Sequence, residues 1–207
     1  MRNRTNLIKY RLWAPLYDLV FADDLIKQAR RRIFELVDIQ PGQKVLLVGV
    51  GTGQDLPFIQ DQADVTGIDL SPAMLAKAPE KAKTRTRLLI MNAENLSFAE
   101  AFFDVVVMNL ILSVVENPRL ALGEAVRVVK PGGKIIVFDK FVSAGVKPGR
   151  LKLILNFFTT LGGTDITRSF EEIAQNQNLD ILKREDSIFG GQYQIILLQK
   201  RKEGNLD

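Results

Sequence analysis

The residues with the clearest chemical meaning are three closely spaced glycines and an aspartate that follows them. Gly49, Gly51 and Gly53 come directly after an apolar run, and Asp69 stands 20 residues after Gly49. Glycine allows positive φ and close approach of a ligand to the backbone, and a helix start behind it offers free N–H groups. A carboxylate at the end of the next strand can accept hydrogen bonds from ribose hydroxyls. The pair predicts a site for an adenosine-type ligand; the alternative is a tight turn without a ligand.

The composition excludes several other chemistries. The 207 residues include no Cys and no His, so disulfides, thiolate metal sites, His-ligated zinc and a Ser-His-Asp triad are impossible. Any proton transfer must therefore use Asp, Glu, Lys, Tyr or water, and we expect no metal.

The net charge of +4 is concentrated near the N-terminus. Residues 1–40 carry 8 basic and 5 acidic side chains, residues 41–140 carry 11 of each, and residues 141–207 carry 9 and 8. We interpret 1–40 as a helical leader or lid, 41–140 as the ligand-binding core, and 141–207 as a substrate-side segment that completes the same domain. The longest charge-free apolar run, between Asp104 and Glu116, is too short to span a membrane, so we expect a cytoplasmic protein.

Alternating strand and helix signals must position the glycines and the aspartate. Strands are predicted at 44–49, up to Asp69, and at 87–91, 105–110 and 134–139. Helices are predicted from Asp23 or Asp24 to about Val37, from Ser71-Pro72 to about Ala82, and from Asn117-Pro118 to just before Pro131. This alternation predicts a three-layer α/β/α, doubly wound, mostly parallel sheet.

The C-terminal part changes character. Ser169 and Glu172 have the spacing of a capping box, which predicts a helix to about Gln177. Residues 180–187 and 192–200 predict two antiparallel strands around Gly190-Gly191, which brings the sheet to seven strands.

Five blocks in order resemble the class I S-adenosylmethionine-dependent methyltransferases. The likeness is carried by Val45-Leu46-Leu47-Val48-Gly49-Val50-Gly51-Thr52-Gly53, Gly67-Ile68-Asp69-Leu70-Ser71-Pro72-Ala73-Met74-Leu75, Asn92-Ala93-Glu94-Asn95-Leu96, Phe103-Asp104-Val105-Val106 and Arg127-Val128-Val129-Lys130-Pro131-Gly132-Gly133. Within that family, the chain resembles the ubiquinone/menaquinone methyltransferase group through Trp13-Ala14-Pro15-Leu16-Tyr17-Asp18. It also resembles the soluble bacterial phosphatidylethanolamine N-methyltransferases, through Val48-Gly49-Val50-Gly51-Thr52-Gly53 with Leu56-Pro57, and through Ser113-Val114-Val115-Glu116-Asn117-Pro118.

The resemblance implies S-adenosyl-L-methionine as cofactor and a set of contacts to it. The glycines would line its methionyl end, Asp69 would hold the ribose, Leu70, Asn92 and Ala93 would meet the adenine, and Asn109 and Leu110 would lie beside the methionyl group. Thr52, Met74 and Glu94 complete the expected set. The chain departs from the family pattern at Leu47 and Asn92, where many members carry an acidic residue.

Methyl transfer requires alignment more than acid–base catalysis, and an amine acceptor must lose one proton. Tyr17, Asp18 or a water could take that proton, although ordinary packing of an amphipathic helix also explains Tyr17. The basic leader and residues 147–161 combine Lys and Arg with large apolar side chains, which favours reversible contact with anionic membrane. The alternative there is a solvated helix face plus an internal lid.

We therefore expect methyl transfer to a small or lipid-like acceptor, preferably the amine of phosphatidylethanolamine at a membrane surface. The runner-up is C-methylation of a quinone precursor. An NAD-dependent oxidoreductase is disfavoured by the Gly-x-Gly-x-Gly spacing, and a non-catalytic cofactor-binding protein remains an alternative. No nucleic-acid partner is expected, because the basic residues lack interleaved aromatics or a reader motif.

Overall fold

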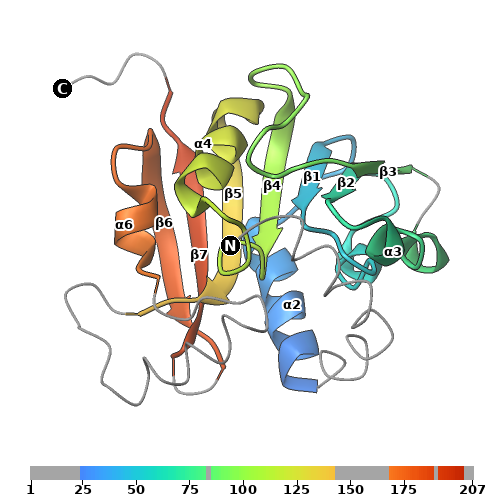
Figure 1. Cartoon of the computed structure of the whole chain (residues 1–207), viewed down its shortest axis with the longest axis horizontal. Helices are drawn as coiled ribbons and strands as arrows, with labels where there is room; N and C mark the ends of the chain where they lie inside the picture. Colours follow the sequence, from blue (N-terminus) through green and yellow to red (C-terminus); the bar gives the residue numbers. More distant parts are fainter. Residues whose placement is uncertain (1–23, 83–84, 143–167, 189–190, 203–207) are drawn as a thin grey trace.

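Seven strands form one sheet in the order β3-β2-β1-β4-β5-β7-β6 (Figure 1). The computed structural model describes residues 24–82, 85–142, 168–188 and 191–202. The strands are β1 (Lys44–Val48), β2 (Asp64–Asp69), β3 (Thr86–Ile90), β4 (Phe103–Asn109), β5 (Val129–Lys140), β6 (Leu179–Asp186) and β7 (Tyr193–Lys200). Strands β1 to β5 pair in parallel, whereas β7 pairs antiparallel with both β5 and β6. The predicted fold class and the C-terminal hairpin are confirmed.

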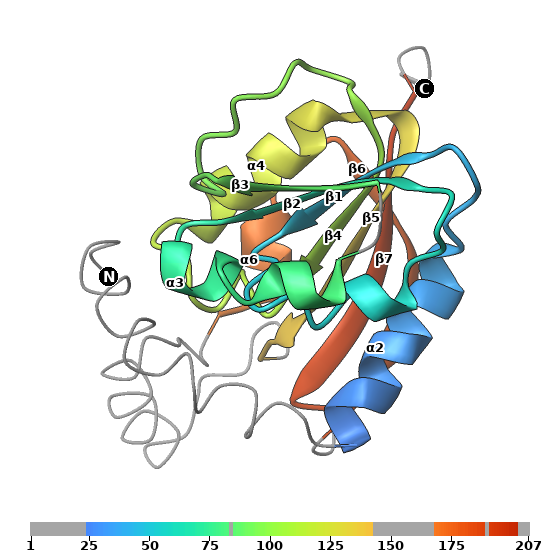
Figure 2. The ribbon, with the colours of Figure 1, turned by 90° about the vertical axis from the view of Figure 1, so that its right-hand side faces the viewer.

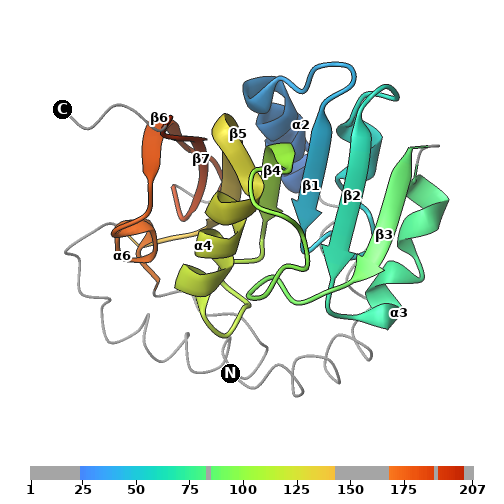
Figure 3. The same ribbon diagram turned by 90° about the horizontal axis from the view of Figure 1, so that it is seen from above.

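Helices pack on both faces of this sheet (Figures 2 and 3). They are α2 (Asp24–Val37), α3 (Pro72–Leu75), α4 (Pro118–Val128) and α6 (Phe170–Ala174), with 3-10 turns η1 (Leu56–Phe58) and η2 (Ala78–Lys81). One apolar core joins the sheet to α2, η1, α3 and η2, and the other joins it to α4 and α6. The central strands read as apolar on both faces because each face is covered. No helix within the described ranges is long and apolar enough to cross a membrane.

Two predicted helices differ from the observed ones. The helix expected from Ser71-Pro72 to about Ala82 begins correctly, since the Ser71 hydroxyl accepts from the Met74 amide, but it ends at Leu75. A second short turn, η2, contains Pro79, and proline lacks the N–H that a continuous helix requires.

The predicted capping box of Ser169 and Glu172 is wrong. Ser169 is the N-cap of α6, but its hydroxyl donates to Glu171 Oε2 (2.8 Å) and caps no backbone amide. The other oxygen of Glu171 contacts Arg184 of β6, which holds this carboxylate beside Ser169. The helix ends at Ala174 rather than Gln177, and Asn176 then adopts a left-handed φ of +64°.

The strand order places the candidate site. The chain runs from β1 outward to β2 and β3, then returns to β4 on the other side of β1. At such a switch point, the connections that leave the carboxyl ends of the strands diverge and create a crevice. The loops after β1, β2 and β4 all begin at the carboxyl ends of these strands, which we call the carboxyl edge of the sheet, or simply this edge.

A buried ion pair fixes α2 against the loop that follows β1. Arg30 of α2 contacts Asp55, and both side chains are less than one-tenth exposed. Asp55 lies two residues after Gly53 and immediately before η1. A buried ion pair of this kind stabilises the fold only while both partners are present, because either one alone is an uncompensated buried charge.

We expect Arg30→Met to lower the free energy of unfolding by about 3 kcal/mol, because it leaves the Asp55 carboxylate buried without a partner. Urea denaturation followed by circular dichroism measures this change. Arg31→Met is the matched control, since Arg31 is the next residue of α2 and is exposed. Equal losses for the two variants would show that the pair does not stabilise the fold.

Candidate active site

The glycine loop turns sharply between β1 and η1. Gly49, Gly51 and Gly53 have φ of +74°, +55° and +79°, values that glycine adopts without strain. A Cβ at Gly49 would lie 2.7 Å from Ile111, and one at Gly53 would lie 2.9 Å from Leu56. A Cβ at Gly51 would meet only Asp69 Oδ2 and the Gly49 carbonyl, both at 4.0 Å. The loop therefore packs against protein at its two ends and leaves open space at its middle.

Asp69 joins this loop to the turn after β2. Its Oδ2 accepts from the Gly51 amide (2.9 Å), and its Oδ1 accepts from the Ser71 amide (2.8 Å). Burial raises the pKa of Asp69 above its usual range, and the amides of Ser71, Gly51 and Leu70 offset part of this rise. Each carboxylate oxygen keeps acceptor capacity beyond these bonds, so two ribose hydroxyls could donate to it.

Asn109, the last residue of β4, has a buried side-chain amide with no described partner. The residue is 6% exposed, and neither Nδ2 nor Oδ1 makes a hydrogen bond. The next residue, Leu110, has a left-handed φ of +56°, and its amide donates to the Phe138 carbonyl (2.7 Å). Buried amides are nearly always paired, so a group bound at this edge is the natural partner of Asn109.

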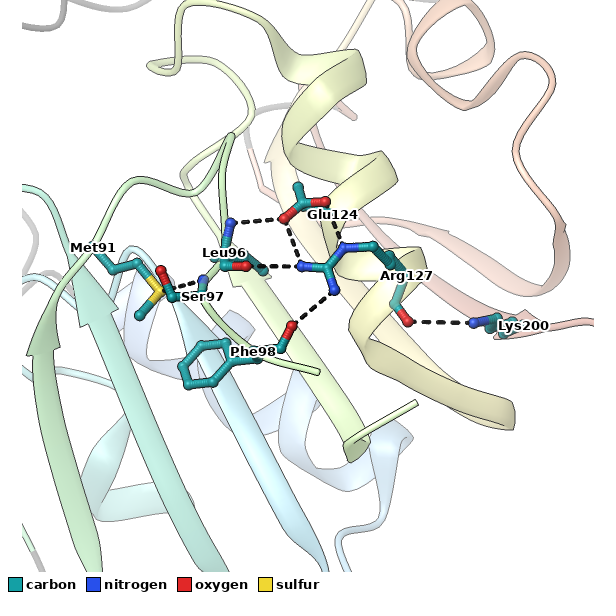
Figure 4. A network of polar contacts seen from close by, with 7 residues as sticks. All are labelled: Met91, Leu96, Ser97, Phe98, Glu124, Arg127 and Lys200. Atoms are coloured by element: carbon teal, nitrogen blue, oxygen red, sulfur yellow. Dashed lines mark hydrogen bonds and ion pairs between the residues drawn. The ribbon is translucent and has the colours of Figure 1, made fainter. Parts of the chain in front are cut away.

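The loop after β3 is held to α4 by one of its own carboxylates, that of Glu94, and by charged side chains of α4. Asn92 Oδ1 accepts from the Glu94 amide (3.0 Å), and Glu94 Oε1 accepts from the amides of Glu116 (2.8 Å) and Asn117 (3.1 Å). The Arg127 guanidinium donates to the carbonyls of Leu96 and Phe98, both at 2.8 Å (Figure 4).

Glu124 completes this clamp. Its carboxylate binds Arg127 and accepts from the Leu96 amide at 2.7 Å (Figure 4). The hydrogen bond from Arg127 lowers the pKa of Glu124, so the carboxylate stays charged well below neutral pH. The clamp holds the loop of Asn92 and Ala93 against the sheet edge.

The other predicted contacts are less informative. Thr52, Met74 and Ala93 are buried, and Leu70 and Leu110 are half-buried. The structure brings the glycines, Asp69, Asn92 and Asn109 to one edge of the sheet. Tyr17 and Asp18, and residues 147–161, lie outside the described residues.

Leu47 lies in the core rather than at the edge. It is 1% exposed and belongs to the apolar core on the α2 face of the sheet. Its partner across the sheet is Val107, two residues before Asn109, and alternate residues of a strand share a face. Asn109 therefore lies on the same face of the sheet as Leu47, on the neighbouring strand β4 and two residues closer to its carboxyl end.

A group of ionisable side chains at the ends of β5 and β7 was not singled out from the sequence. Asp139 is fully buried and accepts from the amides of Ser113 (2.9 Å) and Lys140 (2.8 Å). Burial raises the pKa of Asp139, and burial together with that charge raises the pKa of Tyr193 to about 12. The available signal was Asp139 followed by Lys140 at the carboxyl end of an apolar strand, because the carboxyl ends of parallel strands gather at the crevice.

The loop between β4 and α4 is fixed from a second side as well. Arg168 donates to the Val115 carbonyl (2.9 Å) and also contacts the Leu112 carbonyl. Together with the bond from the Ser113 amide to Asp139, this leaves little freedom in the backbone that follows Asn109.

Comparisons with known proteins agree with this geometry. A family described as "Methyltransferase domain" matches residues 46–137. The chain is 33% identical over 199 residues to a phosphatidylethanolamine N-methyltransferase of Cereibacter sphaeroides, and the match covers 93% of this chain and 96% of that protein. It is also 36% identical over 130 residues to a demethylmenaquinone methyltransferase of Renibacterium salmoninarum, covering 61% of this chain and about half (54%) of that protein.

The fold is likewise shared with solved structures. One is a chain in the complex of the Haloferax volcanii Trm112 methyltransferase activator with a putative methyltransferase, at a TM-score of 0.77 and 16% identity over 93% of this chain and 97% of that chain. The chain belongs to the class I S-adenosylmethionine-dependent methyltransferases. It is an enzyme of that class, and S-adenosyl-L-methionine is its cofactor.

The residues at this edge fit the cofactor. The open space at Gly51 and the unpartnered amide of Asn109 offer room and polar capacity. We propose that Asp69 holds the ribose, that the glycine loop and Asn109 hold the methionyl part, and that Asn92 and Ala93 meet the adenine.

We expect Asp69→Ala to weaken the binding of S-adenosylhomocysteine by at least about tenfold, since hydrogen bonds to a charged group contribute roughly 1.5–3 kcal/mol each. Isothermal titration calorimetry gives the dissociation constant. Asp64→Ala is the control, because Asp64 starts the same strand at the opposite edge and is exposed. Unchanged affinity in Asp69→Ala would remove Asp69 from the cofactor site.

Gly51→Ala and Gly53→Ala should separate binding from stability. At Gly51 an alanine costs about 1–2 kcal/mol through its left-handed φ, but its methyl fills the open space, so cofactor affinity should fall by at least about tenfold. At Gly53 the methyl also collides with Leu56 and Ala78, so stability should fall further. Urea denaturation and calorimetry on both variants measure the two effects. Normal affinity in Gly51→Ala would contradict this assignment.

Proposed function

We propose that this methyltransferase methylates the amine of phosphatidylethanolamine at a membrane surface. The observation that carries the proposal is the length of its likeness to the Cereibacter sphaeroides phosphatidylethanolamine N-methyltransferase, which extends over 93% of this chain and 96% of that protein. The likeness therefore includes the segments outside the glycine loop, where acceptor pockets of this fold are built.

The proposed reaction makes modest demands on the chain. When bound, S-adenosyl-L-methionine supplies a methyl carbon activated by a positively charged sulfur. The protein has to place the amine in line with that carbon, exclude water, and accept the proton that the ammonium loses. A chain without histidine can meet these demands.

Two roles follow from the residues themselves. Asn109 Oδ1 is proposed to accept a hydrogen bond from the methionyl ammonium. It would take the place of the acidic side chain that many family members carry at the position of Leu47. We assign the proton of the acceptor amine to Tyr17, Asp18 or a water. Residues 1–23 and 147–161 are proposed to contact anionic lipid through their Lys and Arg side chains.

C-methylation of a quinone precursor is the second candidate. It is favoured by the 36% identity to the Renibacterium salmoninarum demethylmenaquinone methyltransferase, but that match spans only 61% of this chain. The uncovered part of the chain has no counterpart in this comparison, which is why we rank it second.

The test uses methyl-labelled S-adenosyl-L-methionine and vesicles of anionic phospholipid that contain either phosphatidylethanolamine or demethylmenaquinone. We expect label in the extracted phosphatidylethanolamine. At a cofactor concentration below the wild-type dissociation constant, incorporation should fall at least about tenfold in Asp69→Ala through its weaker cofactor binding.

Label in the quinone alone would overturn the preferred acceptor and support the second candidate. Cofactor binding without transfer to either acceptor would contradict both and favour a protein that binds the cofactor without turnover.

A further inference from the structure

Lys140 is a half-buried lysine and the last residue of β5. Its ammonium lies over the ring of Tyr193, 5.2 Å from the centroid. No described carboxylate forms an ion pair with it. Burial lowers the pKa of Lys140, and the neighbouring charge of Asp139 offsets only part of this decrease. A desolvated cation of this kind is stabilised by a bound anion.

The sheet places Lys140 on the same face and edge as Asn109. Asn109 pairs with Phe138 across β4 and β5, and Lys140 follows Phe138 by two residues. Alternate residues share a face, and Phe138 and Tyr193 both belong to the core on the α2 side. Lys140 therefore stands about 7 Å further along the strand than Asn109, toward the outside of the crevice.

The nearby carboxylate does not neutralise this lysine directly. Asp139 points to the opposite face, where the amide of Ser113 donates to it, and its second oxygen is bound by the Lys140 amide. Its partner across β5 and β7 is Gln194, whose oxygen is already bound by Arg184. The α2 face at this position thus presents a cation and an aromatic ring.

We propose that Lys140 binds the phosphate of the acceptor and thereby selects a phospholipid headgroup over a quinone. The inference rests on the proposed function. In phosphatidylethanolamine two carbons and an oxygen separate the amine from the phosphate, so an amine near Asn109 places an anion outward of it. A quinone precursor such as demethylmenaquinone carries no phosphate and gains nothing from this cation.

The test uses dihexanoyl-phosphatidylethanolamine as a dissolved monomer, so that binding to a membrane surface does not contribute. We expect Lys140→Met to raise KM for this lipid by at least about tenfold, the effect of losing one charge-assisted hydrogen bond, with kcat changed by less than about threefold. Lys140→Arg should recover most of the lost affinity. The dissociation constant of S-adenosylhomocysteine should stay unchanged in both variants.

Lys44→Met is the matched control. Lys44 also lies over an aromatic ring, that of Phe102 at 4.1 Å, but at the amino end of β1 and the opposite edge of the sheet. It carries the same charge change with no expected effect on KM. A purely structural role of Lys140 would lower thermal stability and kcat without a rise in KM that arginine reverses.

Three outcomes decide the matter. A KM for the lipid that is unchanged in Lys140→Met overturns the inference while the proposed function stands. If the wild type does not methylate the lipid, a second experiment is used. Calorimetry in the presence of S-adenosylhomocysteine then measures the dissociation constants of glycerophosphoethanolamine and of ethanolamine. If glycerophosphoethanolamine binds more tightly than ethanolamine and Lys140→Met abolishes this difference, the anion site is supported and only the proposed acceptor is rejected. If the two compounds bind equally, both the anion site and the proposed acceptor are overturned.

Discussion

The carboxylate of Asp69 connects the two turns on which the site depends. One oxygen holds the amide of Gly51 in the loop after β1, and the other holds the amide of Ser71 at the start of α3. The Ile68 carbonyl, one residue earlier, accepts from the amides of Gly49 and Val50 (both 2.9 Å). The backbone after β1 is therefore fixed to the end of β2 along three consecutive residues. A loop held in this way binds a ligand without losing much further conformational entropy.

Charged side chains repeat this role around the rest of the edge. Arg30 and Asp55 secure the far end of the glycine loop to α2. Arg127 and Glu124 of α4 secure the loop after β3 through hydrogen bonds to the backbone of Leu96 and Phe98. Asp139 and Arg168 hold the backbone after β4 from two sides. Each of these charged side chains makes a contact with a loop, in most cases with its backbone amides or carbonyls. Such contacts help to order loops, which cannot bury enough apolar surface to order themselves.

The edge of the sheet that results presents the polar side chains of Asp69, Asn92 and Asn109. Methyl transfer from a sulfonium draws on the cofactor for its leaving group, so positioning dominates. That explains how an enzyme without histidine or cysteine can use the fold. On the α2 face, Asn109 is a buried polar side chain at this edge, whereas Leu47 on the neighbouring strand contributes to apolar packing.

Much of this architecture is determined by local sequence. The apolar runs, the glycines and the Ser71-Pro72 and Asn117-Pro118 caps specify strands, turns and helix starts through interactions within a few residues, and these predictions are confirmed. The predicted helix from Ser71-Pro72 to about Ala82 was too long, because Pro79 interrupts it. The predicted capping box was wrong because the Ser169 hydroxyl donates to Glu171, which also contacts Arg184. Only the tertiary structure revealed that Asn109 is buried without a described partner and that Lys140 shares its face. These properties depend on which strands lie side by side and on what covers them, and β5 meets β7 only after about fifty residues of intervening chain.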